Sequence, residues 1–134
     1  ARGNLLKARQ SPGARIALFD LYERRIQKML DEASTEKWDG AEPVTLDAYR
    51  VAYRLVEHLP ADIPMPSVGA EPDGHLTLEW YKSPSRGLSI SVGPAGELNY
   101  AALLGETSRR TGSEVFQNRV PGDLLQLIHQ VLAA

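Results

Sequence analysis

The spacing of apolar residues changes near residue 75, and this change constrains the fold more than any other feature. Before it, apolar side chains recur every three or four residues, the period of an amphipathic α-helix. After it, apolar and polar side chains alternate, the period of a half-buried β-strand. Residues 60–74 lie between these regions and contain four prolines and two glycines, so we expect an extended crossover there. Helices and strands in separate runs predict an α+β fold.

Two N-terminal helices are expected before the crossover. The first spans residues 14–33, whose apolar positions form one stripe. The second begins after Thr45, whose hydroxyl suits an N-cap, and ends before Pro60, because proline disfavours helical geometry in the preceding residue. Between the helices, Trp38 is expected to plug the core beside a tight turn that ends at Gly40.

An antiparallel meander of three or four strands is expected after the crossover, followed by a C-terminal helix. The alternation leaves one face of the sheet apolar and the other wet. A polar loop at residues 106–112 is expected to precede a short fourth strand at residues 114–118. Pro121 suits the first turn of the last helix, since its missing N–H costs nothing there. The three strands with clear alternation are residues 75–82, 88–92 and 97–104.

One domain is expected, because 134 residues are too few for two adequate cores. An apolar fraction of 43% excludes a fully disordered chain. Residues 1–13 are predicted to be a flexible basic lead-in, and residues 14–134 a single α+β domain. The expected core consists of inward positions on separate elements: Phe19, Ile26, Tyr53, Val56, Leu78, Trp80, Ile90, Val92, Leu127 and Ile128.

Charge is distributed unevenly along the chain. Residues 1–28 hold seven basic and two acidic residues, a net charge of +5, whereas the whole chain carries −2. A basic arm is typical of a solvated helix face or of a phosphate-binding segment, and the acidic remainder favours the first. We therefore expect no specific binding of nucleic acid.

Composition also bears on location. No stretch approaches the roughly 18–20 apolar residues that a membrane span needs, so no membrane partner is expected. The chain has no cysteine, which excludes disulfides and thiolate chemistry and favours a reducing compartment. A cytoplasmic location is the expectation.

Few residues are candidates for catalysis or cofactor binding. The three histidines lack the spacing of metal ligands such as HExxH. Ser83 and Ser85 lack the GxSxG pattern of a nucleophile elbow. The Gly-Pro-Ala-Gly stretch joins two strands, so it predicts a turn rather than a phosphate-binding loop. We expect no catalytic residue, no cofactor and no metal.

Arginine and aromatic side chains mark the candidate binding surfaces. Arg109 and Arg110 in the polar loop, with Arg86 on the first hairpin, offer guanidinium groups that clamp a carboxylate or phosphate. Tyr81 beside Arg86 provides the aromatic-plus-arginine pair that interfaces favour. We therefore expect Tyr81, Arg86, Arg109 and Arg110 to bind a partner. The expected wet face of the sheet carries Thr77, Glu79, Tyr81, Ser89, Ser91, Asn99, Ala101 and Leu103.

A meander also has two free edges. An edge strand presents unpaired N–H and C=O groups that recruit a strand from another protein or from a second copy. Self-association through a sheet edge is therefore a second mode of binding that the sequence predicts.

The tract of residues 38–105, about half of the chain, resembles small bacterial proteins of unassigned function. The shared pattern includes Trp38-Asp39-Gly40, the segment PDGxLxLEW at residues 72–80, and Tyr100. The resemblance implies an accessory or neutralising binder from mobile or toxin–antitoxin-like gene neighbourhoods. None of the shared residues forms a catalytic motif.

These observations favour a non-enzymatic protein-binding accessory module, antitoxin-like or related to phage or mobile elements. Its expected partner is another bacterial protein or a second copy. Two alternatives stay open. One is a small hydrolase-type enzyme built around Glu79 and a histidine. The other is a nucleic-acid-associated regulator that uses the basic N-terminal helix.

Overall fold

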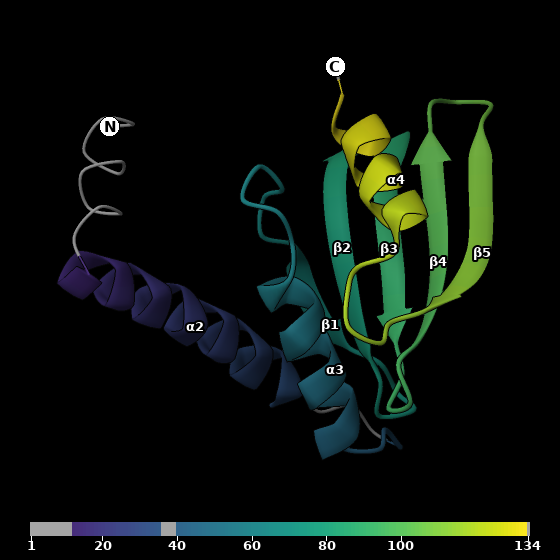
Figure 1. The fold of residues 1–134 in the computed structure, drawn as a ribbon. Coiled ribbons are helices and arrows are strands. Elements are labelled where there is room, and N and C mark those ends of the chain that lie inside the picture. The colour runs from purple at the N-terminus through teal and green to yellow at the C-terminus, as the bar shows by residue number, and fades with distance from the viewer. Residues whose placement is uncertain (1–11, 36–39, 134) are drawn as a thin grey trace.

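The computed structural model describes residues 12–35 and 40–133, with only the backbone for residues 12–19 (Figure 1). Two helices precede a five-stranded antiparallel sheet and one helix follows it, so the predicted α+β fold is confirmed. The helices are α2 (Pro12–Ser34), α3 (Leu46–Glu57) and α4 (Gly122–Leu132). The strands are β1 (Ser67–Ala70), β2 (Leu76–Ser83), β3 (Arg86–Val92), β4 (Glu97–Leu104) and β5 (Arg109–Val115).

The strands lie in the sheet in the same order as in the chain, β1-β2-β3-β4-β5. α4 packs on β2, β3 and β4, and α3 packs on β2 and β3 of the same sheet (Figure 1). α2 contacts α3 and β1, and its N-terminal half extends away from the sheet. The helices that pack on the central strands therefore cover one face of the sheet, and the described elements leave the opposite face open.

Two strands differ from the sequence-based expectation. β1 lies within residues 60–74, which were expected to be an extended crossover, and pairs with β2 from Ser67 opposite Glu79 to Ala70 opposite Leu76. β5 spans Arg109–Val115, where a polar loop and a later strand were expected. Both segments lack an apolar alternation, so their strand conformation comes from hydrogen bonding to a neighbouring strand rather than from their own pattern.

The core lies between the helices and the sheet. Eight of the ten predicted core residues are buried, Tyr53 is half-buried against the core, and the side chain of Phe19 lies outside the described residues. Trp80 is 3% exposed, and its indole Nε1 donates to the carbonyl of Pro64 at 2.9 Å. The indole N–H is the one polar group of this buried ring, and buried tryptophans usually pair it with an acceptor in this way.

The start of α3 follows its predicted signal, whereas Pro121, expected in the first turn of the last helix, is the N-cap residue that precedes α4. The Thr45 hydroxyl accepts a hydrogen bond from the Ala48 N–H at 3.1 Å, which confirms it as the N-cap of α3. α2 begins at Pro12, so the first helix starts two residues before its expected position. The rest of the expected lead-in, residues 1–11, and the expected Trp38 plug lie outside the described residues.

Within the described part of the chain, no helix combines the length and apolar content that crossing a membrane requires.

Candidate functional site: the open face of the sheet

The face of the sheet that the helices leave open is the candidate site. Strand alternation directs Leu78 and Ile90 to the helices, and therefore directs Glu79 and Ser89 to the opposite face. All eight residues expected on the wet face lie there, and β5 adds four more: Arg109, Thr111, Ser113 and Val115. The sequence does not predict these β5 residues on this face, because most of their segment is expected to be a loop.

Three of these residues and Gly87 lie in one line across the sheet, and we call the four the Tyr81–Arg109 row. Tyr81 pairs with Gly87, Gly87 with Leu103, and Leu103 with Arg109. The row crosses three strand intervals, roughly 14 Å. It presents an aromatic ring, a gap at the glycine, an aliphatic side chain and a guanidinium group in that order.

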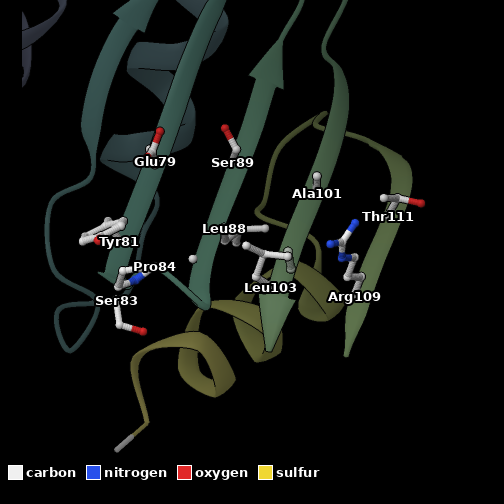
Figure 2. Close-up of a pocket in the computed structure, with 12 residues that line it drawn as sticks. Glu79, Tyr81, Ser83, Pro84, Leu88, Ser89, Ala101, Leu103, Arg109 and Thr111 are labelled. Carbon is white, nitrogen blue, oxygen red and sulfur yellow. The ribbon is translucent and has the colours of Figure 1, made fainter. Parts of the chain in front are cut away.

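The gap at Gly87 forms part of a hollow of about 490 Å³ on this face (Figure 2). Tyr81 lies at one side of the hollow and Arg109 at the other, with Leu103 between them and nearer to Arg109 (Figure 2). Tyr81 is 63% exposed and Leu103 is 36% exposed. Large apolar side chains that stay accessible around a hollow are typical of sites that bind another molecule.

Polar groups lie in the adjacent row, where Glu79 pairs with Ser89 and Ala101 with Thr111. Ser89 and Ala101, which pair with each other, have small side chains that leave space in this part of the hollow. Glu79 lies on the Tyr81 side, so a carboxylate and the Arg109 guanidinium lie on opposite sides of the hollow (Figure 2). Arg109 has no ion-pair partner among the described residues. The site is therefore apolar in the middle, with one charge of each sign at its margins.

Two of the four expected partner-binding residues lie on the other face. Arg86 is the first residue of β3 and shares the helix-facing side with Leu88, so it does not lie beside Tyr81 as expected. Its Nε donates to the carbonyl of Val131 at 3.2 Å, and its Nη2 donates to the carbonyl of Gln130. Arg110 pairs with Ala102 and also faces the helix side. Because successive side chains of a strand point to opposite faces, Arg86 and Arg110 lie on the other face from the Tyr81–Arg109 row.

The hydrogen bonds of Arg86 give this residue a structural role at the end of α4. The last carbonyls of a helix have no partner within the helix and carry partial negative charge. Arg86 donates to two of them at the end of α4, and Lys82 donates from its Nζ to Leu132 O at 2.7 Å. Together these side chains fix the C-terminal turn of α4 to the β2–β3 hairpin.

The histidines lie apart from Glu79. His58 is the C-cap of α3, and His129 lies on α4, 3.5 Å from Asp62. His75 precedes β2 and is four residues from Glu79, roughly 13 Å along an extended chain. No histidine is therefore within hydrogen-bonding reach of the Glu79 carboxylate.

One group of three possible metal ligands occurs among the described residues, Glu71, Asp73 and His75 in the β1–β2 turn. Asp73 Oδ1 accepts a hydrogen bond from the His75 N–H at 3.1 Å, and Glu71 Oε2 accepts one from the Thr77 hydroxyl at 2.7 Å. These bonds are those of a turn stabilised by its own side chains. They account for the cluster without a ligand.

The contact between α2 and α3 holds the groups with shifted pKa values. Burial, followed by a hydrogen bond and charge repulsion from Glu57, raises the pKa of Glu23 to about 7. Burial and the hydrogen bond from its hydroxyl to Asp31 Oδ1 at 2.7 Å raise the pKa of Tyr49 to about 12. Both groups lie away from the open face. Their electrostatics therefore concern the docking of α2 rather than the candidate site.

The basic residues of α2 that the structure describes lie on its exposed side. Arg24 forms an ion pair with Asp20 at 2.8 Å, and Arg25 and Lys28 are exposed. The other basic residues of the N-terminal segment have no described side chain. Comparison of the chain with protein-family models, curated proteins and solved structures finds no match.

Proposed function

We propose that this protein is a non-enzymatic binding module that takes a segment of another protein on the open face of its sheet. The Tyr81–Arg109 row carries the proposal, because it combines accessible apolar side chains with an arginine that lacks an ion-pair partner among the described residues. Tyrosine and arginine are enriched at positions that dominate binding energy in interfaces. The lack of cysteine supports the cytoplasm as the proposed compartment.

The row defines the chemistry of the proposed ligand. Tyr81 and Leu103 flank Gly87, so an apolar side chain of the ligand fits between them. Arg109 lies two strand intervals from Gly87, roughly 10 Å, and suits a carboxylate. The proposed ligand is therefore a segment with an apolar anchor and an Asp, Glu or terminal carboxylate one or two side chains away.

The same geometry favours binding over hydrolysis. A general base works within hydrogen-bonding reach of the proton it removes, and a histidine that orients Glu79 must lie equally close. The nearest histidine along β2 is roughly 13 Å away by strand spacing. This separation supports a binding role over a hydrolase built around Glu79 and a histidine.

Selection from a display library of random short peptides tests the proposal. We expect enriched peptides to carry an aromatic or aliphatic residue close to a carboxylate. Tyr81→Ala and Arg109→Gln should each weaken their binding at least tenfold, about 1.4 kcal/mol. Arg119→Gln is the matched control, because Arg119 is also exposed but lies outside the hollow. A library without binders, or peptides that bind the variants as tightly as the parent protein, would contradict the proposal.

A further inference from the structure

Among the described residues, no strand pairs with the outer side of β5, so this strand forms one edge of the sheet. It is the outermost strand in Figure 1, and β4 is its partner in the sheet. The Leu104 N–H donates to Ser108 O at 2.9 Å, and the Phe116 N–H donates to Gly96 O at 2.8 Å. Both bonds fit the β4–β5 register, so Ser108 and Phe116 bond to β4. Bonded and non-bonded pairs alternate in an antiparallel ladder, so the even-numbered residues between them also bond to β4, and the odd-numbered residues direct their backbone groups outward. The outward N–H and C=O groups of β5 therefore belong to Arg109, Thr111, Ser113 and Val115.

We propose that two copies of this chain associate through β5, in an antiparallel pairing centred on Gly112. In this register Arg109 lies opposite Val115 of the second copy, and Thr111 lies opposite its Ser113. All four of these residues direct their backbone groups outward, so every pair forms hydrogen bonds across the new boundary. The two sheets then form one continuous sheet with a two-fold axis at Gly112.

Charge complementarity selects this register. On the helix-facing side, Arg110 lies opposite Glu114 of the second copy, and the symmetry repeats the pair. These are non-hydrogen-bonded positions, where opposing side chains approach most closely. Neither Arg110 nor Glu114 belongs to an ion pair among the described residues. The pairing therefore joins charges that have no ion-pair partner in the described part of a single copy.

The alternative registers lack this complementarity. A shift of two residues preserves the outward hydrogen bonds but places Arg110 opposite Gly112 or Phe116. A shift of four residues places Arg110 opposite Arg110, or Glu114 opposite Glu114, and like charges directly opposite destabilise a strand pair. An arginine and a glutamate at equal distances from Gly112 thus make this strand complementary to itself. An isologous two-fold interface requires this property.

The exposed apolar side chain of Val115 also favours association with a second copy. Val115 is 57% exposed in a single chain. The proposed pairing places the aliphatic part of Arg109 of the second copy across from it, and covers Val115 on that side. Arg109 belongs both to this boundary and to the Tyr81–Arg109 row, whereas Tyr81 and Leu103 lie on strands away from the boundary.

Light scattering on the full chain tests the association. The mass should approach twice the 14.7 kDa of one chain as the concentration rises to about 1 mM, the range in which weak pairing is measurable. Arg110→Glu and Glu114→Arg each place like charges opposite one another twice, and each should weaken dimerisation at least tenfold. Arg119→Glu is the matched control for Arg110→Glu, because it makes the same change in net charge outside β5 and should leave the dimer unchanged.

Mixing the two weakened variants tests the register. The Arg110→Glu chain carries a carboxylate at both positions 110 and 114, and the Glu114→Arg chain carries a guanidinium group at both. The two chains are therefore complementary, so the mixture should form a heterodimer while each variant alone stays monomeric. A chain that combines both substitutions should regain the parental dimer. Variants that dimerise as strongly as the parent, or a mixture that stays monomeric, would overturn the proposed register.

Hydrogen exchange on the unmodified protein gives a readout that no variant's folding affects. The outward amides of Arg109, Thr111, Ser113 and Val115 should exchange more slowly at concentrations that favour the dimer, whereas the inward amides should be protected throughout. A parent protein that stays monomeric at about 1 mM would overturn the proposal. Protection of these amides only after another protein is added would assign the edge to that protein and also overturn it.

Discussion

At the scale of single residues, adjacent side chains in β2 have opposite environments. Trp80 is 3% exposed and packs in the core, whereas Tyr81 is 63% exposed on the open face. The alternation of the strand separates them, although they are neighbours in the chain. An aromatic residue in this strand is therefore buried in the core at an even-numbered position and exposed on the open face at an odd-numbered one.

Substitution of the two aromatic residues should separate these effects. Trp80→Ala removes a large buried ring and leaves the carbonyl of Pro64 without its donor, so we expect a loss of about 3–5 kcal/mol in the free energy of unfolding. Tyr81→Ala should change it by less than about 0.5 kcal/mol. Urea denaturation measures both. Equal losses for the two variants would show that the assigned faces are wrong.

Glu23 predicts a dependence of stability on pH. Its carboxyl holds a proton up to about pH 7 in the folded protein, whereas the unfolded chain releases it near the ordinary pKa of 4.5. Between these values the folded state binds more protons, so the free energy of unfolding falls as the pH rises from about 4.5 to about 7. Stability should therefore be higher at the acidic end of this window than at its neutral end.

Glu23→Gln should remove most of this dependence, because the side chain of glutamine stays neutral throughout this pH range. The thermal midpoint is measured at about pH 5 and at about pH 8, a range that covers most of this window. The difference between the two midpoints should be smaller in the variant than in the parent. Glu32→Gln is the matched control, since Glu32 is an exposed residue of the same helix. If the midpoints of the Glu23→Gln variant differ as much as those of the parent, Glu23 does not cause the pH dependence of stability.

At the scale of the elements, the C-terminal end of α4 depends on a hairpin that is distant in sequence. Arg86 and Lys82 donate to carbonyls of Gln130, Val131 and Leu132. Arg86 is half-buried, whereas the Lys82 side chain is exposed. Of the two, Arg86 is therefore expected to contribute more to the docking of α4.

Arg86→Met keeps the aliphatic part of the side chain and removes the donors. We expect the free energy of unfolding to fall by about 1.5–3 kcal/mol, as for other hydrogen bonds from charged groups. Amides in the last turn of α4 should also exchange faster. Arg109→Met is the matched control, because Arg109 points to the open face, away from the helices. Comparable destabilisation by both variants would contradict the role of Arg86.

Elements with a clear period were predictable from the sequence, and elements without one were not. β3 alternates strictly from Leu88, and β2 and β4 alternate along part of their length, so their existence and their buried faces follow from the sequence. β5 contains Arg109, Arg110, Gly112 and Glu114, and becomes a strand because β4 presents free backbone groups to it. The sequence alone does not show which backbone groups remain unpaired.

The same reason explains the outcome at the candidate site. Tyr81 could be placed on the wet face because β2 has a clear alternation. Arg86 was expected in a loop, where a side chain has no defined face, but β3 begins at that residue. A small difference in where the strand starts therefore decides whether this arginine faces the helices.

At the scale of the whole molecule, packing is uneven along α2. Ile26, Leu30 and Ala33 in its C-terminal half are buried, whereas the N-terminal half of the helix extends away from the sheet (Figure 1). Isolated helical turns are marginal in water without tertiary contacts. The stability of α2 should therefore decrease toward its N-terminus.

Hydrogen exchange should show this decrease directly. Amides of Asp20 and Leu21, whose side chains are exposed, are expected to exchange at least tenfold faster than those of residues 27–33, where Leu30 and Ala33 are buried. α4 is the internal control, since buried residues from Leu124 to Val131 extend along most of its length. Uniform protection along α2 would mean that another contact stabilises its first turns.

The order of the sheet has a consequence for synthesis on the ribosome. Every strand pairs with its neighbours in the chain, so each hairpin forms as soon as its second strand emerges. The apolar side of β2, β3 and β4 then has no cover from α4, because this helix is made after all five strands. Until α4 emerges and packs on β2, β3 and β4, the apolar side chains that it covers therefore stay exposed to chaperones and proteases.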